Sequence, residues 1–155
     1  MGLCSVMGPL DAISISNCRR CANYAGYMNS FRYTEPVDMR ESAPAQIIAI
    51  DSLACPGELE FEVKGILREV NKAFCGFSCI KETKKGIATG KWGCGVFRCN
   101  PFLKTVIQWI SASLAHQEMV MAPFGDREVE MFAAMLAHTA GSMTVGELSK
   151  RHILA

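Results

Sequence analysis

The sequence predicts an α/β fold in which helices cover a mostly parallel or mixed β-sheet. Over residues 46–140, short apolar runs alternate with longer stretches in which apolar residues recur at helical spacing. That alternation is typical of βα units built on one sheet. Half of the 155 residues are hydrophobic and a fifth are charged, a composition that indicates a globular chain with the length of one domain.

Four short segments are predicted to be strands. The first alternates apolar and polar residues, as a half-buried strand does. The second is apolar throughout and ends on an acid, which is typical of a strand covered on both faces. The predicted strands are residues 10–16, 46–51, 86–89 and 119–122.

Helices are predicted between and after the later strands, the first two on the basis of apolar stripes at helical spacing. The stripe of residues 60–74 is Phe61, Ile66, Leu67, Val70 and Phe74. The stripe of residues 101–115 is Phe102, Val106, Trp109, Ile110 and Leu114, and Pro101 lies in the first turn, where proline is tolerated. Residues 127–138 are predicted to form a third helix, and Thr144 and Glu147 match a capping box that begins a fourth.

Two connecting segments differ in character. Residues 18–45 are rich in Asn, Gly, Tyr, Arg, Pro and Ser without a sustained period, so they are predicted to form a long loop. Ordered loops of that length are usually functional. Residues 90–95 contain three glycines and form a tight turn between a strand and a helix.

The charge balance excludes some classes of partner. Sixteen basic and fifteen acidic residues leave a formal charge of +1, which gives no basic field for holding a nucleic-acid backbone. We therefore expect no direct DNA binding. No apolar run approaches the roughly 18 residues of a membrane-spanning helix, so we expect no membrane association either.

The eight cysteines are predicted to be free thiols rather than disulfides or metal ligands. The N-terminus lacks the pattern of a secretory signal, which favours a reducing compartment. Cys18 and Cys21 have the gap of a zinc knuckle, but their only plausible mates, Cys75 and Cys79, lie among apolar neighbours at helical spacing. We expect no metal and no cofactor.

Two segments follow predicted strands and could hold a ligand, because ligands of open α/β sheets lie beyond the carboxyl ends of the strands. The glycine-rich residues 89–97 could bring backbone N–H groups close to a phosphate, although a turn without a ligand explains the same glycines. Phe124 could stack on a base or simply close the core. Taken alone, neither segment decides between these alternatives.

Catalytic constellations are absent from the residue patterns. His116, His138 and His152 fall in predicted helical stretches without an adjacent acid or nucleophile, so we interpret them as surface residues. Acidic residues alternate with apolar ones at the N-termini of two predicted helices. The helix dipole favours negative charge there, so we interpret these acids as structural. No catalytic residue is assigned.

Six strings, in this order, closely resemble the C-terminal half of the catalytic domain of poly(ADP-ribose) glycohydrolases, most like the plant members. The similarity covers most of residues 13–148, and the strings at 71–77 and 89–95 are the most specific to that family. The strings are Ile48–Asp51, Leu67–Phe77, Ala88–Gly95, Ile107–Ile110, Phe124–Asp126 and Thr144–Glu147. The resemblance implies one partial catalytic domain over residues 1–155, with the fold of a partial macrodomain-like three-layer α/β/α sandwich.

The resemblance also implies a binding site for ADP-ribose or poly(ADP-ribose). Tyr27 matches the tyrosine that closes over the ligand, and Phe124 matches the aromatic residue that stacks on adenine. The loop that wraps the diphosphate corresponds here to Lys91, Trp92, Gly93, Cys94, Gly95, Val96 and Phe97. Enzymes of the family cleave ribose–ribose bonds of the polymer, and their setting implies a role in the DNA damage response, poly(ADP-ribosyl)ated proteins as partners, and a location in the nucleus or cytoplasm.

The departures from the family pattern concern catalysis. The family's general acid is the last residue of a Gln-Glu-Glu tract upstream of the ligand-closing tyrosine, and no such tract occurs in these residues. The family Asn after Thr-Gly is Lys91 here, and its Gly-Gly-Asp is Arg98-Cys99-Asn100. We therefore expect a truncated or degenerate family member that is inactive as a stand-alone chain, with a non-catalytic ADP-ribose binding module as the alternative.

Overall fold

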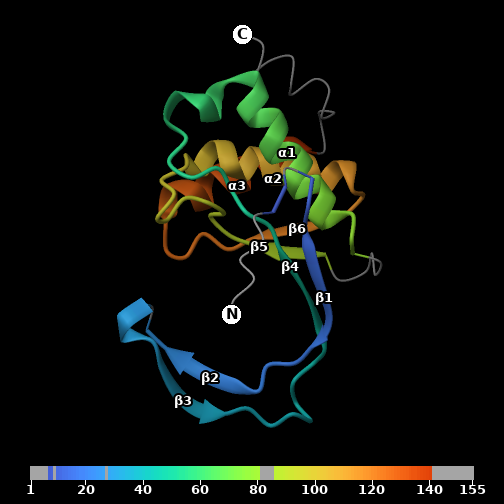
Figure 1. Cartoon of the computed structure of the whole chain (residues 1–155), viewed down its shortest axis with the longest axis vertical. Coiled ribbons are helices and arrows are strands. Elements are labelled where there is room, and N and C mark those ends of the chain that lie inside the picture. Colours follow the sequence, from blue (N-terminus) through green and yellow to red (C-terminus); the bar gives the residue numbers. More distant parts are fainter. Residues whose placement is uncertain (1–6, 9, 27, 81–85, 141–155) are drawn as a thin grey trace.

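The computed structural model describes residues 7–8, 10–26, 28–80 and 86–140 (Figure 1). The described strands are β1 (Ile13–Cys18), β2 (Ala22–Ala25), β3 (Arg32–Pro36), β4 (Ala45–Ala49), β5 (Ile87–Thr89) and β6 (Met119–Met121). The α-helices are α1 (Val63–Phe77), α2 (Pro101–Leu114) and α3 (Arg127–Ala140), and two short 3₁₀ helices are η1 (Met28–Ser30) and η2 (Gly57–Phe61). The four predicted strands and the first three predicted helices are confirmed, with ends shifted by a few residues. The predicted capping box at 144–147 lies outside the described residues.

The described strands form three separate pairs with mixed directions. β1 and β4 pair antiparallel, with Ile13 opposite Ala49. β5 and β6 pair parallel, with Ile87 opposite Met119, so their carboxyl ends lie at one edge. The α/β class is therefore confirmed, although the described strands form small separate sheets rather than one mixed sheet.

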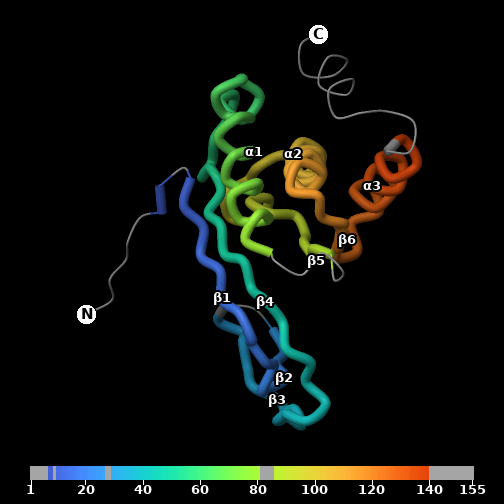
Figure 2. Tube along the Cα trace, turned by 90° about the vertical axis from the view of Figure 1, so that its right-hand side faces the viewer, coloured from blue at the N-terminus to red at the C-terminus, as the bar shows by residue number. Residues whose placement is uncertain are grey.

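The long loop predicted for residues 18–45 is wrong, because part of it is a hairpin. β2 and β3 pair antiparallel and project as an arm away from the three helices (Figures 1 and 2). The hairpin presents most of its side chains to solvent, so its sequence lacks the apolar alternation by which a strand is identified. Its aromatic residues stabilise it locally: the rings of Tyr24 and Phe31 lie 5.2 Å apart, and Arg20 covers Tyr24.

The helices pack as a layer in which α2 lies between α1 and α3 (Figure 2). A small core of Ala73, Phe77, Ile87 and Ala112 joins α1, β5 and α2. Phe102 of α2 packs edge-on against Phe132 of α3, with ring centroids 5.2 Å apart. The apolar stripe predicted for α2 thus faces α3 in part, although Leu114 is exposed.

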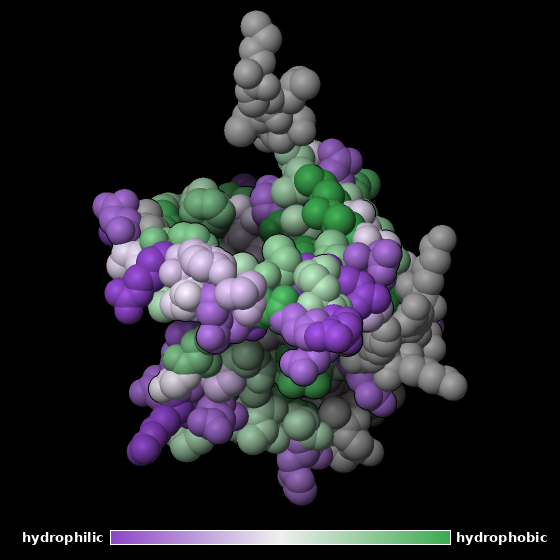
Figure 3. All heavy atoms as spheres, turned by 90° about the horizontal axis from the view of Figure 1, so that it is seen from below, coloured by the Kyte–Doolittle hydropathy of each residue, from purple (hydrophilic) through white to green (hydrophobic). Residues whose placement is uncertain are grey.

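The apolar stripe predicted for residues 60–74 is confirmed as buried only at Ile66. Phe61, Leu67 and Phe74 are exposed, whereas Glu69 and Lys72 are buried. The same exchange occurs on α2, where polar side chains face α1. Charged groups can be buried on these helices because each is paired, Glu69 with Lys104 of α2 and Lys72 with Asp51 after β4, which apolar periodicity does not reveal. Apolar side chains also reach the surface among polar ones on the face shown in Figure 3. None of the helices in the described part is long and apolar enough to cross a membrane.

Candidate functional site

The two segments predicted to hold a ligand lie side by side. Because β5 and β6 are parallel neighbours, the chain leaves both strands at the same edge, and the amide of Ala122 donates to the carbonyl of Thr89 over 2.8 Å. We call residues 90–97, after β5, the glycine loop, and residues 122–126, after β6, the aromatic loop. Their juxtaposition at the carboxyl ends of parallel strands is the geometry in which α/β proteins place ligands.

The glycine loop consists of two successive turns. The amide of Cys94 donates to the carbonyl of Lys91, and the amide of Arg98 to that of Gly95, over 3.1 and 3.0 Å. Gly93, at the third position of the first turn, has a φ of +77°. A Cβ there would overlap the Ser52 hydroxyl and lie 3.1 Å from the Cys99 sulfur, so only glycine fits this position.

The second turn presents free backbone donors. Within the part of the chain that the structure describes, the N–H groups of Gly95, Val96 and Phe97 donate no hydrogen bond. All three residues are exposed. Successive unpaired N–H groups in a turn attract an anion such as a phosphate.

Phe124 is the most exposed large apolar side chain in the described residues, at 79%. Its backbone has a φ of +53° and that of Gly125 a φ of +81°, in a turn closed by the Asp126 amide on the Pro123 carbonyl. A positive φ is unfavourable for a bulky residue, and strained positions of this kind gather at functional sites. The Phe124 ring lies against Gly90, where a Cβ would come within 2.6 Å of it. Phe124 therefore does not close the core; it offers an open ring face beside the glycine loop.

An ion pair joins the two loops. The Lys91 ammonium lies 3.1 Å from a carboxylate oxygen of Asp126, which also caps α3 through the amide of Val129. The hydrogen bond from Lys91, followed by that from Val129, lowers the pKa of Asp126 below its ordinary value. The Lys91 cation is thus held between the loops, where it can also meet an anion.

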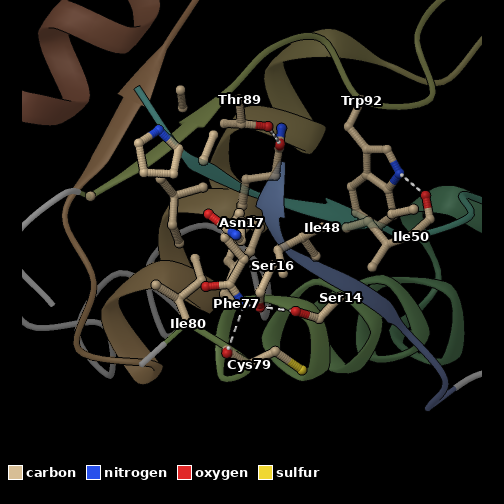
Figure 4. A pocket seen from close by; sticks show the side chains of 18 of the residues that line it. Ser14, Ser16, Asn17, Ile48, Ile50, Phe77, Cys79, Ile80, Thr89 and Trp92 are labelled. Carbon is tan, nitrogen blue, oxygen red and sulfur yellow. Dashed lines mark hydrogen bonds between the residues drawn. The ribbon is translucent and has the colours of Figure 1, made fainter. Parts of the chain in front are cut away.

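Trp92 and Cys94 turn inward from the glycine loop. The Trp92 indole Nε1 donates to the carbonyl of Ile50 over 3.3 Å (Figure 4), which fixes the loop to the end of β4. Burial raises the pKa of the Cys94 thiol to about 12, so this thiol is neutral at physiological pH. These two side chains support the loop, whereas Val96 and Phe97 face solvent.

Tyr27, the remaining predicted ligand residue, lies outside the described residues. The flanking strand β2 belongs to the arm, which extends away from the helices in both views (Figures 1 and 2). The described residues therefore bring together the glycine loop and Phe124. The contact of Tyr27 with a ligand stays a prediction.

A cavity of about 1140 Å³ lies between the β1–β4 pair and β5 (Figure 4). Consecutive residues of β4 and β5 line it, including Ile48 and Ile87, together with Ile50 and Trp92. The two strands are thus separated by this cavity. Its lining includes neither Lys91 nor Phe124 nor the free amides, so the candidate ligand groups face elsewhere.

A buried ion network lies beneath the glycine loop, and apolar periodicity did not predict it. Lys104 of α2 and Glu69 of α1 form an ion pair, and Lys104 also donates to Ser52 Oγ over 2.7 Å. Burial, with the Arg68 guanidinium nearby, lowers the pKa of Lys104 to about 7, while contact with Glu69 favours its charged form. One signal in the sequence could have indicated this network: Lys104 and Gln108 lie on the helix face opposite Phe102.

A second carboxylate, Asp51, completes the network. Burial alone would raise the pKa of Asp51. Hydrogen bonds from Lys72 and Arg68 outweigh this effect and hold the pKa of Asp51 below its ordinary value. Both cations lie 2.6 Å from its carboxylate oxygens. The network thus consists of three basic and two acidic side chains: Lys72, Lys104, Arg68, Asp51 and Glu69.

Arg98 carries backbone strain where the family pattern has glycine. Its φ is +56°, so arginine occupies a conformation that favours glycine. We expect Arg98→Gly to raise the free energy of unfolding by up to about 1 kcal/mol, since relief of the strain exceeds the extra unfolded-state entropy of glycine. Urea unfolding of both chains measures the difference. A lower stability for Arg98→Gly would contradict the assignment of strain to this position.

In the described ranges, no group of three or more His, Cys, Asp or Glu side chains is arranged to hold a metal ion. The prediction that His116 lies in a helix is wrong. His116 lies in the turn after α2 and has a φ of +54°. The seven described cysteines, Cys18, Cys21, Cys55, Cys75, Cys79, Cys94 and Cys99, carry free thiols.

The fold and these two loops define an α/β domain with a site suited to an anionic ligand that carries an aromatic ring. Residues 1–131 match the family described as poly(ADP-ribose) glycohydrolase (PARG), macro domain fold. The chain belongs to this family, and the resemblance found in the sequence, with the macrodomain class it implied, is confirmed.

Individual relatives agree with the family. The chain is 29% identical to the probable poly(ADP-ribose) glycohydrolase 2 of Arabidopsis thaliana, over 91% of this chain and 36% of that protein. It is 28% identical to poly(ADP-ribose) glycohydrolase 1 of Arabidopsis thaliana, over 71% of this chain and 34% of that protein. It is 32% identical to poly(ADP-ribose) glycohydrolase 1 of Caenorhabditis elegans, over 83% of this chain and 19% of that protein. The chain thus spans about a third or less of the length of these relatives.

Proposed function

We propose that this chain binds ADP-ribose, free or at the end of poly(ADP-ribose), through the glycine and aromatic loops. One observation carries the proposal: three free amides and an exposed aromatic ring lie at the same edge of two parallel strands. The amides at 95–97 would receive the diphosphate, and Phe124 would stack on adenine. The family to which the chain belongs supports this ligand.

The proposed chemistry of this 155-residue chain is binding without hydrolysis. Cleavage of a glycosidic bond needs a carboxylic acid that protonates the leaving oxygen. The family's Gln-Glu-Glu tract does not occur in these residues, and Asp126 near the aromatic loop is held ionised by Lys91. A carboxylate held in its charged form is a poor proton donor. The proposal places the protein with poly(ADP-ribosyl)ated partners in the nucleus or cytoplasm.

Thermal melting of the purified chain tests ligand binding. Because a ligand specific for the native state raises its stability, millimolar ADP-ribose should shift the midpoint upward. Adenosine, which lacks the diphosphate, should shift it less, because it cannot reach the amides of the glycine loop. A cooperative melt that ADP-ribose leaves unchanged would contradict the proposal.

Hydrolysis is tested separately, with protein purified from a host that lacks such enzymes. Poly(ADP-ribose) incubated with this chain should release no ADP-ribose. Addition of a polypeptide that carries the family's Gln-Glu-Glu tract should restore release if the two parts assemble. Release of ADP-ribose by this chain alone would overturn the non-catalytic part of the proposal and leave the binding part intact.

A further inference from the structure

Lys104 lies directly beneath the first turn of the glycine loop, formed by residues 91–94. It stands one turn after the α2 cap residue Asn100, and it is only 2% exposed. Its ammonium lies 3.5 Å from the centroid of the Trp92 ring. A desolvated cation over the face of tryptophan is strongly attracted to it, so Trp92 is held from below.

The same ammonium also supports the neighbouring Gly93. Lys104 Nζ donates to Ser52 Oγ over 2.7 Å, and this hydroxyl packs against Gly93, where a side chain would overlap it. Ser52 Oγ also lies 3.4 Å from the sulfur of Cys99, whose amide donates to the Gly93 carbonyl over 3.1 Å. Both central residues of the turn, Trp92 and Gly93, thus depend on one buried nitrogen.

The position of Lys104 is itself fixed by the helices. Glu69 of α1 forms an ion pair with it and also receives Ser52 Oγ at 3.1 Å and the Leu53 amide at 3.3 Å. A buried ion pair adds little net stability compared with an apolar pair of similar volume. Stability alone therefore does not explain a lysine at this place, whereas its contacts with the loop do.

We infer that Lys104 is a positioning residue that holds the glycine loop in its ligand-accepting shape. The inference rests on the proposed function, in which this loop receives the diphosphate of ADP-ribose. The ion pair with Glu69 fixes the position of the Lys104 ammonium. The ammonium in turn fixes Trp92 by contact with its ring and Gly93 through the Ser52 hydroxyl. The amides that follow, at 95–97, are thereby oriented before a ligand arrives, and such preorganisation raises affinity.

The test uses the full chain with Trp109→Phe as the parent, so that Trp92 is the one tryptophan. Lys104→Met with Glu69→Gln removes both charges together and leaves no unpaired lysine or glutamate at this pair. Ser111→Ala is the matched control, because it removes another buried hydrogen bond of α2, to the Val70 carbonyl, away from the loop. Measurements at about pH 6 keep Lys104 charged in the parent.

The double variant should melt cooperatively, show increased quenching of Trp92 fluorescence by acrylamide, and bind ADP-ribose about tenfold more weakly, or about 1.4 kcal/mol. Ser111→Ala should change neither Trp92 quenching nor affinity, whatever its melting temperature. Parent-like quenching and affinity in the folded double variant would overturn the inference. If the parent itself does not bind ADP-ribose, the proposed function fails, while the quenching of Trp92 still tests the role of Lys104.

Ser52→Ala provides a second test if the double variant does not fold. This smaller change leaves the ion pair of Lys104 and Glu69 intact and removes the hydroxyl between Lys104 and Gly93. Affinity for ADP-ribose should fall about threefold, which is at the lower end of the net contribution of one hydrogen bond. Unchanged affinity in a folded Ser52→Ala chain would overturn the inferred link to Gly93.

Discussion

Substitution of Gly93 by alanine is expected to lower the free energy of unfolding by about 2 kcal/mol or more and to remove ADP-ribose binding. Two causes act together. The φ of +77° is unfavourable for alanine, and the new methyl group would overlap the Ser52 hydroxyl and lie 2.8 Å from the Ser52 Cβ. Relief of either requires the glycine loop to move, which displaces the amides at 95–97. Urea unfolding and calorimetric titration with ADP-ribose measure the two effects.

Gly95→Ala is the matched control for stability within the same loop. A Cβ at position 95 would meet no atom within 4 Å, and this glycine does not have a positive φ. Its unfolding free energy should change by no more than about 0.5 kcal/mol. Equal stability losses for the two alanine variants would show that the Gly93 turn is not the tightly packed feature described above.

Phe124→Ala is expected to weaken ADP-ribose binding by roughly 1–3 kcal/mol, the scale of one aromatic–base stack. That loss corresponds to an increase of roughly 5- to 150-fold in Kd. Because the ring is 79% exposed, its removal should change the melting temperature of the free chain only slightly. Calorimetric titration and thermal melting separate these two quantities.

Two further variants make the Phe124 experiment specific. Phe124→Trp keeps a flat aromatic face and should retain affinity close to that of the unmodified chain. Phe61→Ala removes another exposed ring, 60% accessible in η2, and should leave affinity unchanged. Loss of binding in Phe61→Ala, or full affinity in Phe124→Ala, would exclude the stacking role of Phe124.

The sequence predicted the elements that are marked by apolar runs and by turn-forming residues at their ends. The runs that became β4, β5 and β6 are apolar and bounded by Asp51, Gly86, Gly90 or Pro123, so their extents were readable. The position of both loops at the carboxyl ends of strands also followed from the sequence, whereas their contact depends on the parallel pairing of β5 with β6. Neither fact required a knowledge of side-chain contacts.

Other features depend on contacts that a linear pattern does not contain. The β2–β3 arm is stabilised by exposed rings and cross-strand pairing rather than by burial, so no apolar alternation marks it. The buried faces of α1 and α2 carry Glu69, Lys72 and Lys104, because Glu69 pairs with Lys104 across the two helices and Lys72 pairs with Asp51 after β4. Such pairs become visible only when these elements are placed together. Arg98 similarly adopts a positive φ that its residue type disfavours.

The central claim is that the ligand site lies on the glycine and aromatic loops, and mapping of amide chemical shifts by NMR tests it most directly. Titration of the labelled chain with ADP-ribose should perturb the amides of Gly93, Gly95, Val96 and Phe97 together with those of Phe124 and Gly125. Amides of the exposed face of α1 should stay unperturbed. Perturbations centred away from both loops, or none at millimolar ligand, would contradict the claim.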